Sequence, residues 1–106
     1  MLFVIMAWAA AANPATINKP RQDFAACIRA FEEKSAKDKL TADAYGVGIK
    51  TACASEADRL TQALVAYDMA MGGKRASAMS NAASDVDDYR LSSVDRFRES
   101  QAQNPQ

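Results

Sequence analysis

The fold is decided by the stretch that joins the two cysteines, residues 27–53, which reads CIRAFEEKSAKDKLTADAYGVGIKTAC. Its middle, around Leu40, is its most polar part and has the composition of a turn. Position 40 is the midpoint of 27 and 53, so an antiparallel hairpin that turns there places Cys27 opposite Cys53. We therefore predict a Cys27–Cys53 disulfide in an all-α fold.

The apolar residues around the cysteines support the same register. A hairpin centred on Leu40 sets Phe31 against Ile49, and it sets Ile28 against Ala52. The first arm carries one apolar stripe at helical spacing, formed by Phe24, Cys27, Ile28 and Phe31. On the chain-entropy estimate, a bridge across this loop adds about 3–4 kcal/mol to the stability of so small a protein.

Start and stop signals predict a helix over about 20–36 and a second over 42–71. Pro20 suits the first turn of a helix, and Asp23 is favourable near the positive end of the helix dipole. Thr41 is a good N-cap for the second helix, where Leu40 and Tyr45 form a hydrophobic staple.

The apolar face of the second helix continues to its end, through Ile49, Cys53, Leu60, Leu64, Tyr67 and Met71. Within its first turns, Gly46 and Gly48 each weaken the helix by about 1 kcal/mol relative to Ala. We expect these glycines to let the first helix approach closely.

A third helix is predicted over about 75–99, after the break at Gly72-Gly73. One continuous helix through the two glycines is the alternative. The expected apolar stripe of the third helix consists of Met79, Ala82, Ala83, Val86, Tyr89, Val94 and Phe97. The result is a helical domain over 19–99, a disulfide-stapled antiparallel hairpin with a third helix. The polar residues 100–106 are expected to form a disordered tail.

The N-terminus has the pattern of an export signal. Residues 2–12 are uninterrupted apolar or small residues, too short a run to span a bilayer. We predict a signal peptide over 1–12, cleaved after Ala12 or after Ala15. No Lys or Arg opens it, so we suspect that the true start lies upstream of Met1. An N-terminal helix buried in a cytosolic protein is the alternative. Export and an even cysteine count together indicate the periplasm or the medium.

Composition argues against several classes of function. Lys plus Arg and Asp plus Glu each number 13, so the basic excess typical of a nucleic-acid binder is missing. The sequence has no His, the commonest general base and metal ligand. We therefore expect no enzyme activity, no cofactor and no stable membrane span after signal cleavage.

The hypothesis that these patterns favour is a non-catalytic module of the cell envelope that binds another protein. The candidate binding patch consists of Tyr67, Met69, Tyr89 and Phe97. One alternative is Cu(I) handling by the thioethers of Met69, Met71 and Met79. The other alternative is self-association, in which the third helix pairs between chains into a dimeric bundle.

Overall fold

A computed structural model describes residues 13–103 of the chain, and the predicted signal peptide over 1–12 lies outside this part. The described residues are all-helical and contain no strand, as predicted. The helices are α2 (Ala15–Lys37), α3 (Ala42–Gly48), α4 (Ala54–Ala70) and α5 (Arg75–Gln103).

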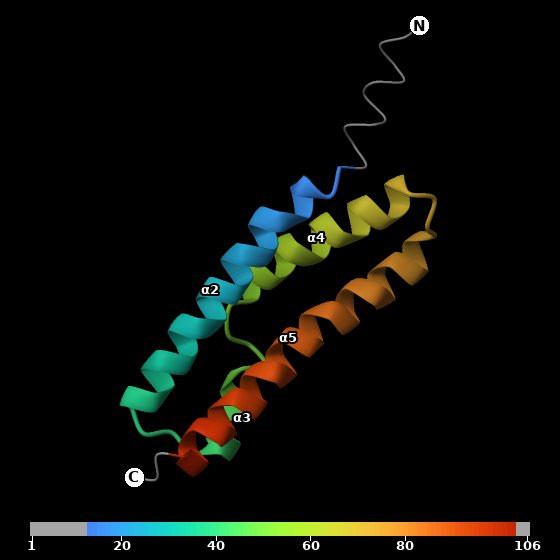
Figure 1. Cartoon of the computed structure of the whole chain (residues 1–106). Helices are drawn as coiled ribbons and strands as arrows, with labels where there is room; N and C mark the ends of the chain where they lie inside the picture. Colours follow the sequence, from blue (N-terminus) through green and yellow to red (C-terminus); the bar gives the residue numbers. More distant parts are fainter. Residues whose placement is uncertain (1–12, 104–106) are drawn as a thin grey trace, which may run out of the picture.

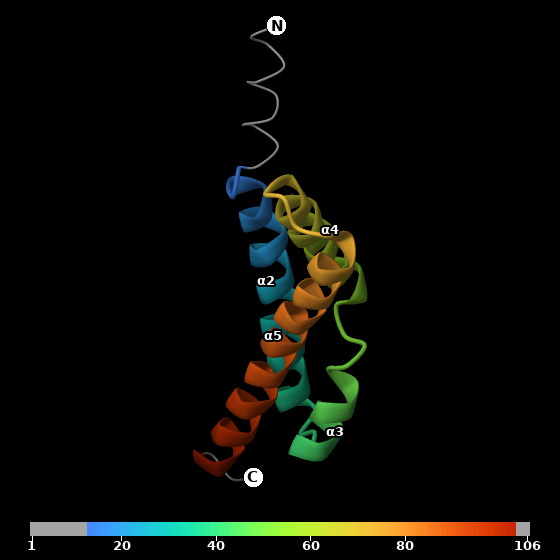
Figure 2. The same cartoon turned by 90° about the vertical axis from the view of Figure 1, so that its right-hand side faces the viewer.

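The helices form an elongated bundle (Figure 1). The long helix α5 runs the length of the bundle, with α2 and α4 packed against its middle and upper parts and α3 against its C-terminal half. The view from the side shows the same order, with α3 and the C-terminal end of α5 at one end of the molecule (Figure 2). The opposite end is the turn between α4 and α5, which we call the tip.

Helix α2 begins five residues earlier than predicted. The start signal is Asn13-Pro14: the Asn13 side-chain oxygen accepts from the Ala15 N–H at 2.9 Å, and the Asn13 carbonyl accepts from the Thr16 N–H. Pro20 therefore lies inside α2 rather than in its first turn. Asp23 also lies beyond the first turn, where it pairs with Lys19 at 3.1 Å.

The single helix predicted over 42–71 is wrong, because it is interrupted at residues 49–53. The backbone bonds become long there, at 3.4 Å from the Lys50 N–H to the Val47 carbonyl, and Cys53 takes a left-handed conformation with φ of 60°. The weak helix formers Gly46 and Gly48 lie just before this break.

The predicted entry into the second arm is confirmed. Thr41 Oγ1 accepts a hydrogen bond from the Ala44 N–H at 3.1 Å, so Thr41 is the N-cap of α3. Leu40 and Tyr45 on either side of this cap pack in the same core. A Cβ on Gly48 would lie 3.1 Å from the Phe31 ring, so this glycine allows the close approach that we expected. Gly46 has no such neighbour.

The glycine break between the second arm and α5 is present, and the continuous-helix alternative is wrong. Gly72 has φ of +100°, and α5 begins at Arg75. The disordered tail predicted for 100–106 is wrong for residues 100–103, which continue α5. The Gln101 side chain there donates a hydrogen bond to the Leu40 carbonyl. Residues 104–106 lie outside the described part.

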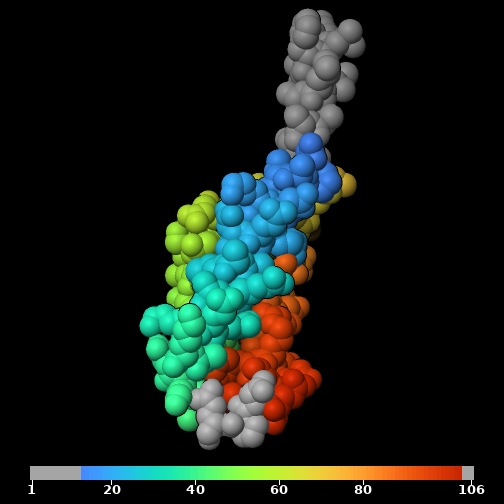
Figure 3. Space-filling view, turned by 60° about the vertical axis from the view of Figure 1, so that its left-hand side comes forward, coloured from blue at the N-terminus to red at the C-terminus, as the bar shows by residue number. Residues whose placement is uncertain are grey.

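Two apolar clusters hold these helices together. The larger one, the main core, joins all four helices and contains Ile17, Phe24, Ile28, Tyr45, Ile49, Ala57, Leu60, Val86 and Phe97. The smaller one lies between α4 and α5 and contains Val65, Ala78 and Ala82. In the space-filling view, α2 covers one face of the molecule, with the C-terminal part of α5 beside its lower end (Figure 3).

Candidate functional site

A groove with exposed methionines runs along the tip of the molecule. It has a volume of about 470 Å³, and the side chains of Met69 and Met79 are 41% and 49% exposed. We call it the methionine groove, and it is lined by Thr61, Gln62, Val65, Ala66, Met69, Arg75 and Met79.

Small residues position the two walls of this groove. Ala78 and Ala82 of α5 are buried against Val65 of α4, which lets the two helices pack closely. The turn at Gly72 brings the chain back in an antiparallel direction, so the walls are two neighbouring antiparallel helices. Because the core beneath the groove is filled by small side chains, the larger methionines lie outside it.

The charge of the methionine groove is one-sided. Among the described residues that line it, only Arg75 is charged, and Lys74 just before it is also exposed. Thr61 and Gln62 add uncharged polar groups at the wall formed by α4. The groove therefore presents an apolar floor with a cation at one end. This arrangement fits an apolar ligand surface that carries an acid.

The predicted binding patch does not form one surface. The prediction of an exposed Phe97 is wrong, because this ring is 4% exposed and stacks on Tyr45 with centroids 4.2 Å apart. Tyr89 packs edge-on against Phe24 and accepts a hydrogen bond from Arg21 at 3.2 Å. The third-helix stripe is also shifted by one residue at its start, since Ala78 rather than Met79 is buried.

The three methionines of the copper alternative line two different hollows. Met69 and Met79 line the methionine groove, whereas Met71 lines a second hollow of about 290 Å³ together with Tyr67 and Asp85. Met71 was expected in the apolar face of the second arm, but it is 63% exposed because it follows the last turn of α4. These two hollows of the described residues separate Met71 from Met69 and Met79.

A buried polar network closes the opposite end of the molecule. Ser93, fully buried, is hydrogen-bonded to the Tyr45 hydroxyl and donates to the Glu32 carboxylate at 2.8 Å. Arg96 forms an ion pair with the same carboxylate. Burial raises the pKa of Tyr45 above its ordinary value of 10.0. These bonds give the polar groups hydrogen-bonding partners, and they link α2, α3 and α5.

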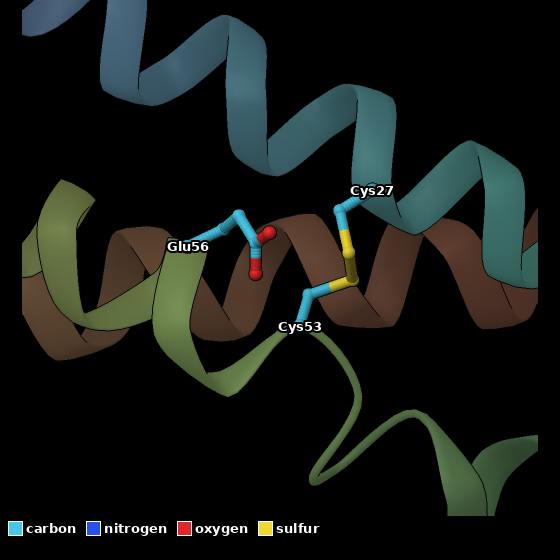
Figure 4. Close-up of side chains that lie close together, drawn as sticks. All are labelled: Cys27, Cys53 and Glu56. Carbon is cyan, nitrogen blue, oxygen red and sulfur yellow. A yellow bond between two sulfur atoms is a disulfide. The ribbon is translucent and has the colours of Figure 1, made fainter.

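The predicted disulfide is present, and Cys27 and Cys53 join α2 to the start of α4 with their Cα atoms 6.0 Å apart. The side chain of Glu56, one turn along α4, points toward the two sulfurs (Figure 4). The two sulfurs and one carboxylate oxygen lie within 4.8 Å of one another, and all three residues are half-buried. The position of Glu56 beside the bridge was not predicted, although its spacing of three residues from Cys53 places both in one helical turn.

Two arginines contact residues next to the disulfide. Arg59 lies 3.8 Å from the Glu56 carboxylate and also donates to Ser55. Arg90 of α5 packs over the Phe24 ring and donates to the Ala52 carbonyl at 3.1 Å, next to Cys53. Arg59 therefore lies beside the carboxylate that faces the sulfurs, and Arg90 contacts the backbone next to Cys53.

Comparisons with known proteins give no assignment: no family model, no curated protein and no solved structure matches this chain. Among the described residues, no helix has both the length and the apolar character needed to cross a membrane.

Proposed function

We propose that this chain is a small exported helical module that binds one amphipathic helix of an envelope protein in its methionine groove. The observation that carries the proposal is a groove between two antiparallel helices, with Met69 and Met79 exposed over a small-residue core. Flexible methionine side chains adapt to apolar partners, and an apolar groove between helices is a common receptor for an amphipathic helix.

The charge of the groove specifies the partner further. Within residues 13–103, no acidic residue lines the groove beside Arg75, so we expect the partner helix to place an Asp or Glu opposite it. The proposed location in the periplasm or the medium is supported by the Cys27–Cys53 disulfide, because such bridges persist in oxidising compartments.

Site-specific photocrosslinking in the native host identifies the partner. A benzophenone side chain is placed at Met69, at Met79 and, as the control, at Ala30, which is exposed on α2 away from the groove. We expect one protein to crosslink at both groove positions and not at Ala30. Crosslinks to a second copy of this chain would replace the proposal with self-association, and equal capture from all three positions would refute it.

A charge exchange then tests the binding mode. The crosslinked partner segment is synthesised as a peptide, and its affinity for the purified protein is measured by calorimetry. Arg75→Glu should weaken binding about tenfold, and a peptide with Lys in place of its acid should restore it. If Arg75→Glu leaves the affinity unchanged, the methionine groove is not the binding site. Arg29→Glu, on the exposed face of α2, is the matched control.

A further inference from the structure

The group formed by Cys27, Cys53 and Glu56 contains the ligand types of a metal site. Each residue offers one ligand atom, and the three atoms lie within 4.8 Å of one another. Figure 4 shows the Glu56 carboxylate directed toward the sulfurs. In the disulfide form the sulfurs are bonded to each other, so they are not thiolates and do not bind a metal ion.

We propose that reduction of the Cys27–Cys53 disulfide converts this group into a zinc site with two thiolates and one carboxylate. Zn²⁺ binds Cys sulfur at about 2.3 Å and carboxylate oxygen at about 2.0–2.2 Å, and it takes a tetrahedral shell. Water supplies the fourth ligand.

The backbone around the cysteines needs little change to form such a site. The Cα atoms, 6.0 Å apart, already hold the two sulfurs toward one centre. Ile28 and Leu60, buried in the main core on α2 and α4, fix the two helices on either side of the bridge. Rotation of the two cysteine side chains then separates the sulfurs to about 3.8 Å, the edge of a tetrahedron with zinc–sulfur bonds of about 2.3 Å.

The surrounding charges suit an anionic zinc centre. Two thiolates and one carboxylate bring three negative charges to the divalent ion, which leaves a net charge of −1. Arg59 lies beside Glu56, and Arg90 donates to the carbonyl that precedes Cys53. Cys53 is also the N-cap of α4, at the positive end of the helix dipole. A helix N-terminus favours the thiolate over the thiol.

The disulfide is converted into the zinc site in two steps, reduction and metal binding. A dithiol reductant transfers two electrons and two protons to the disulfide, which yields two thiols and leaves the reductant as its own disulfide. Binding of Zn²⁺ then forms two zinc–sulfur bonds and releases the two thiol protons. The oxidised and the zinc-bound forms exclude each other, so the chain would bind zinc in response to reducing conditions.

Cobalt titration of the full chain tests this site. The protein is reduced with a phosphine in the absence of oxygen, in which the phosphine takes an oxygen atom from water and the disulfide becomes two thiols. Co²⁺ is then added, followed by Zn²⁺. We expect a thiolate-to-cobalt charge-transfer band that saturates at one metal ion per chain and disappears when Zn²⁺ is added. The oxidised protein should show no such band.

Variants identify the third ligand. Glu56→Gln should weaken Co²⁺ binding by about tenfold or more, whereas Asp58→Asn, an exposed carboxylate on the same helix, should bind like the parent. The comparison holds even if reduction loosens the fold, because metal binding is then coupled to refolding in both variants. Absence of the band from the reduced parent, or equal affinities of the two variants, would overturn the proposal.

Discussion

The two ends of the molecule are built from different side chains. Where α3 meets α5, Tyr45 stacks on Phe97 with ring planes 5° apart, and Ser93, Glu32 and Arg96 form a polar network beside them. At the tip, where α4 turns into α5, the core consists of one valine and two alanines, and Met69 and Met79 lie outside it.

This difference separates stability from binding. Large aromatic side chains remove much apolar area from water, so we expect the α3 end to contribute more to stability than the tip. The small residues of the tip bury little apolar area. They leave a groove whose methionines bury more of their apolar surface only when a partner covers them.

The largest effect is expected from the stacked pair. Phe97→Ala should lower the free energy of unfolding by about 3–5 kcal/mol, because it removes a ring that is 4% exposed and leaves a cavity beside Tyr45. Val65→Ala at the tip should cost about 1–2 kcal/mol. Urea unfolding followed by circular dichroism measures both. Equal costs would mean that the two ends contribute alike.

The disulfide is the next largest contribution. Replacing Cys27 and Cys53 together with Ala should cost about 3–4 kcal/mol, because the 26-residue separation between them is no longer constrained in the unfolded chain. Thermal unfolding of the variant and of the parent checks this value. A variant as stable as the parent would show that the helices keep their register without the bridge.

Burial of the Tyr45 hydroxyl gives a pH dependence of stability above neutrality. Because the pKa of Tyr45 is raised, the unfolded chain loses its phenolic proton near pH 10.0 while the folded chain retains it, so stability falls as the pH rises above that value. Tyr45→Phe should cost about 1 kcal/mol at neutral pH and should flatten this alkaline loss. The measurement is urea unfolding from pH 8 to 11. Parallel curves for the two proteins would exclude Tyr45 as the cause.

The smallest effect on stability is expected at the methionine groove. Met69→Ser with Met79→Ser should change the free energy of unfolding by no more than about 0.5 kcal/mol per site, because 41% of Met69 and 49% of Met79 is already exposed to water. The same double variant should lose binding of the partner peptide. A large loss of stability would place these methionines in the fold rather than in a binding surface.

The sequence predicted the features that depend on strong local signals. The mirror relation about Leu40 identified the Cys27–Cys53 bridge, and a good capping residue identified the start of α3 at Thr41. These signals sufficed because one hairpin register satisfies the bridge and the neighbouring apolar residues at once.

Other features depend on tertiary packing and were not accessible from the sequence. The break at 49–53 needs Cys53 in a left-handed conformation, which no propensity of cysteine favours. Gln101 extends α5 because it reaches the Leu40 carbonyl across the bundle. The exposure of Phe97 was mispredicted because its partner, Tyr45, lies 52 residues earlier in the chain. The methionine groove depends on which face of α5 packs against α4. A shift of one residue in the apolar stripe of α5 changes which side chains line the groove.

Hydrogen exchange of the oxidised protein tests the separation of the two ends most directly. We expect the slowest amide exchange in α2 around Phe24–Ile28 and in α5 around Ser93–Phe97, and faster exchange in the helical turns next to Gly72 on both sides of the tip. Addition of the partner peptide should slow exchange at the tip and leave the α3 end unchanged. Uniform protection along α5, or slower exchange at the tip than at the α3 end, would show that the tip is not the less stable end of the molecule.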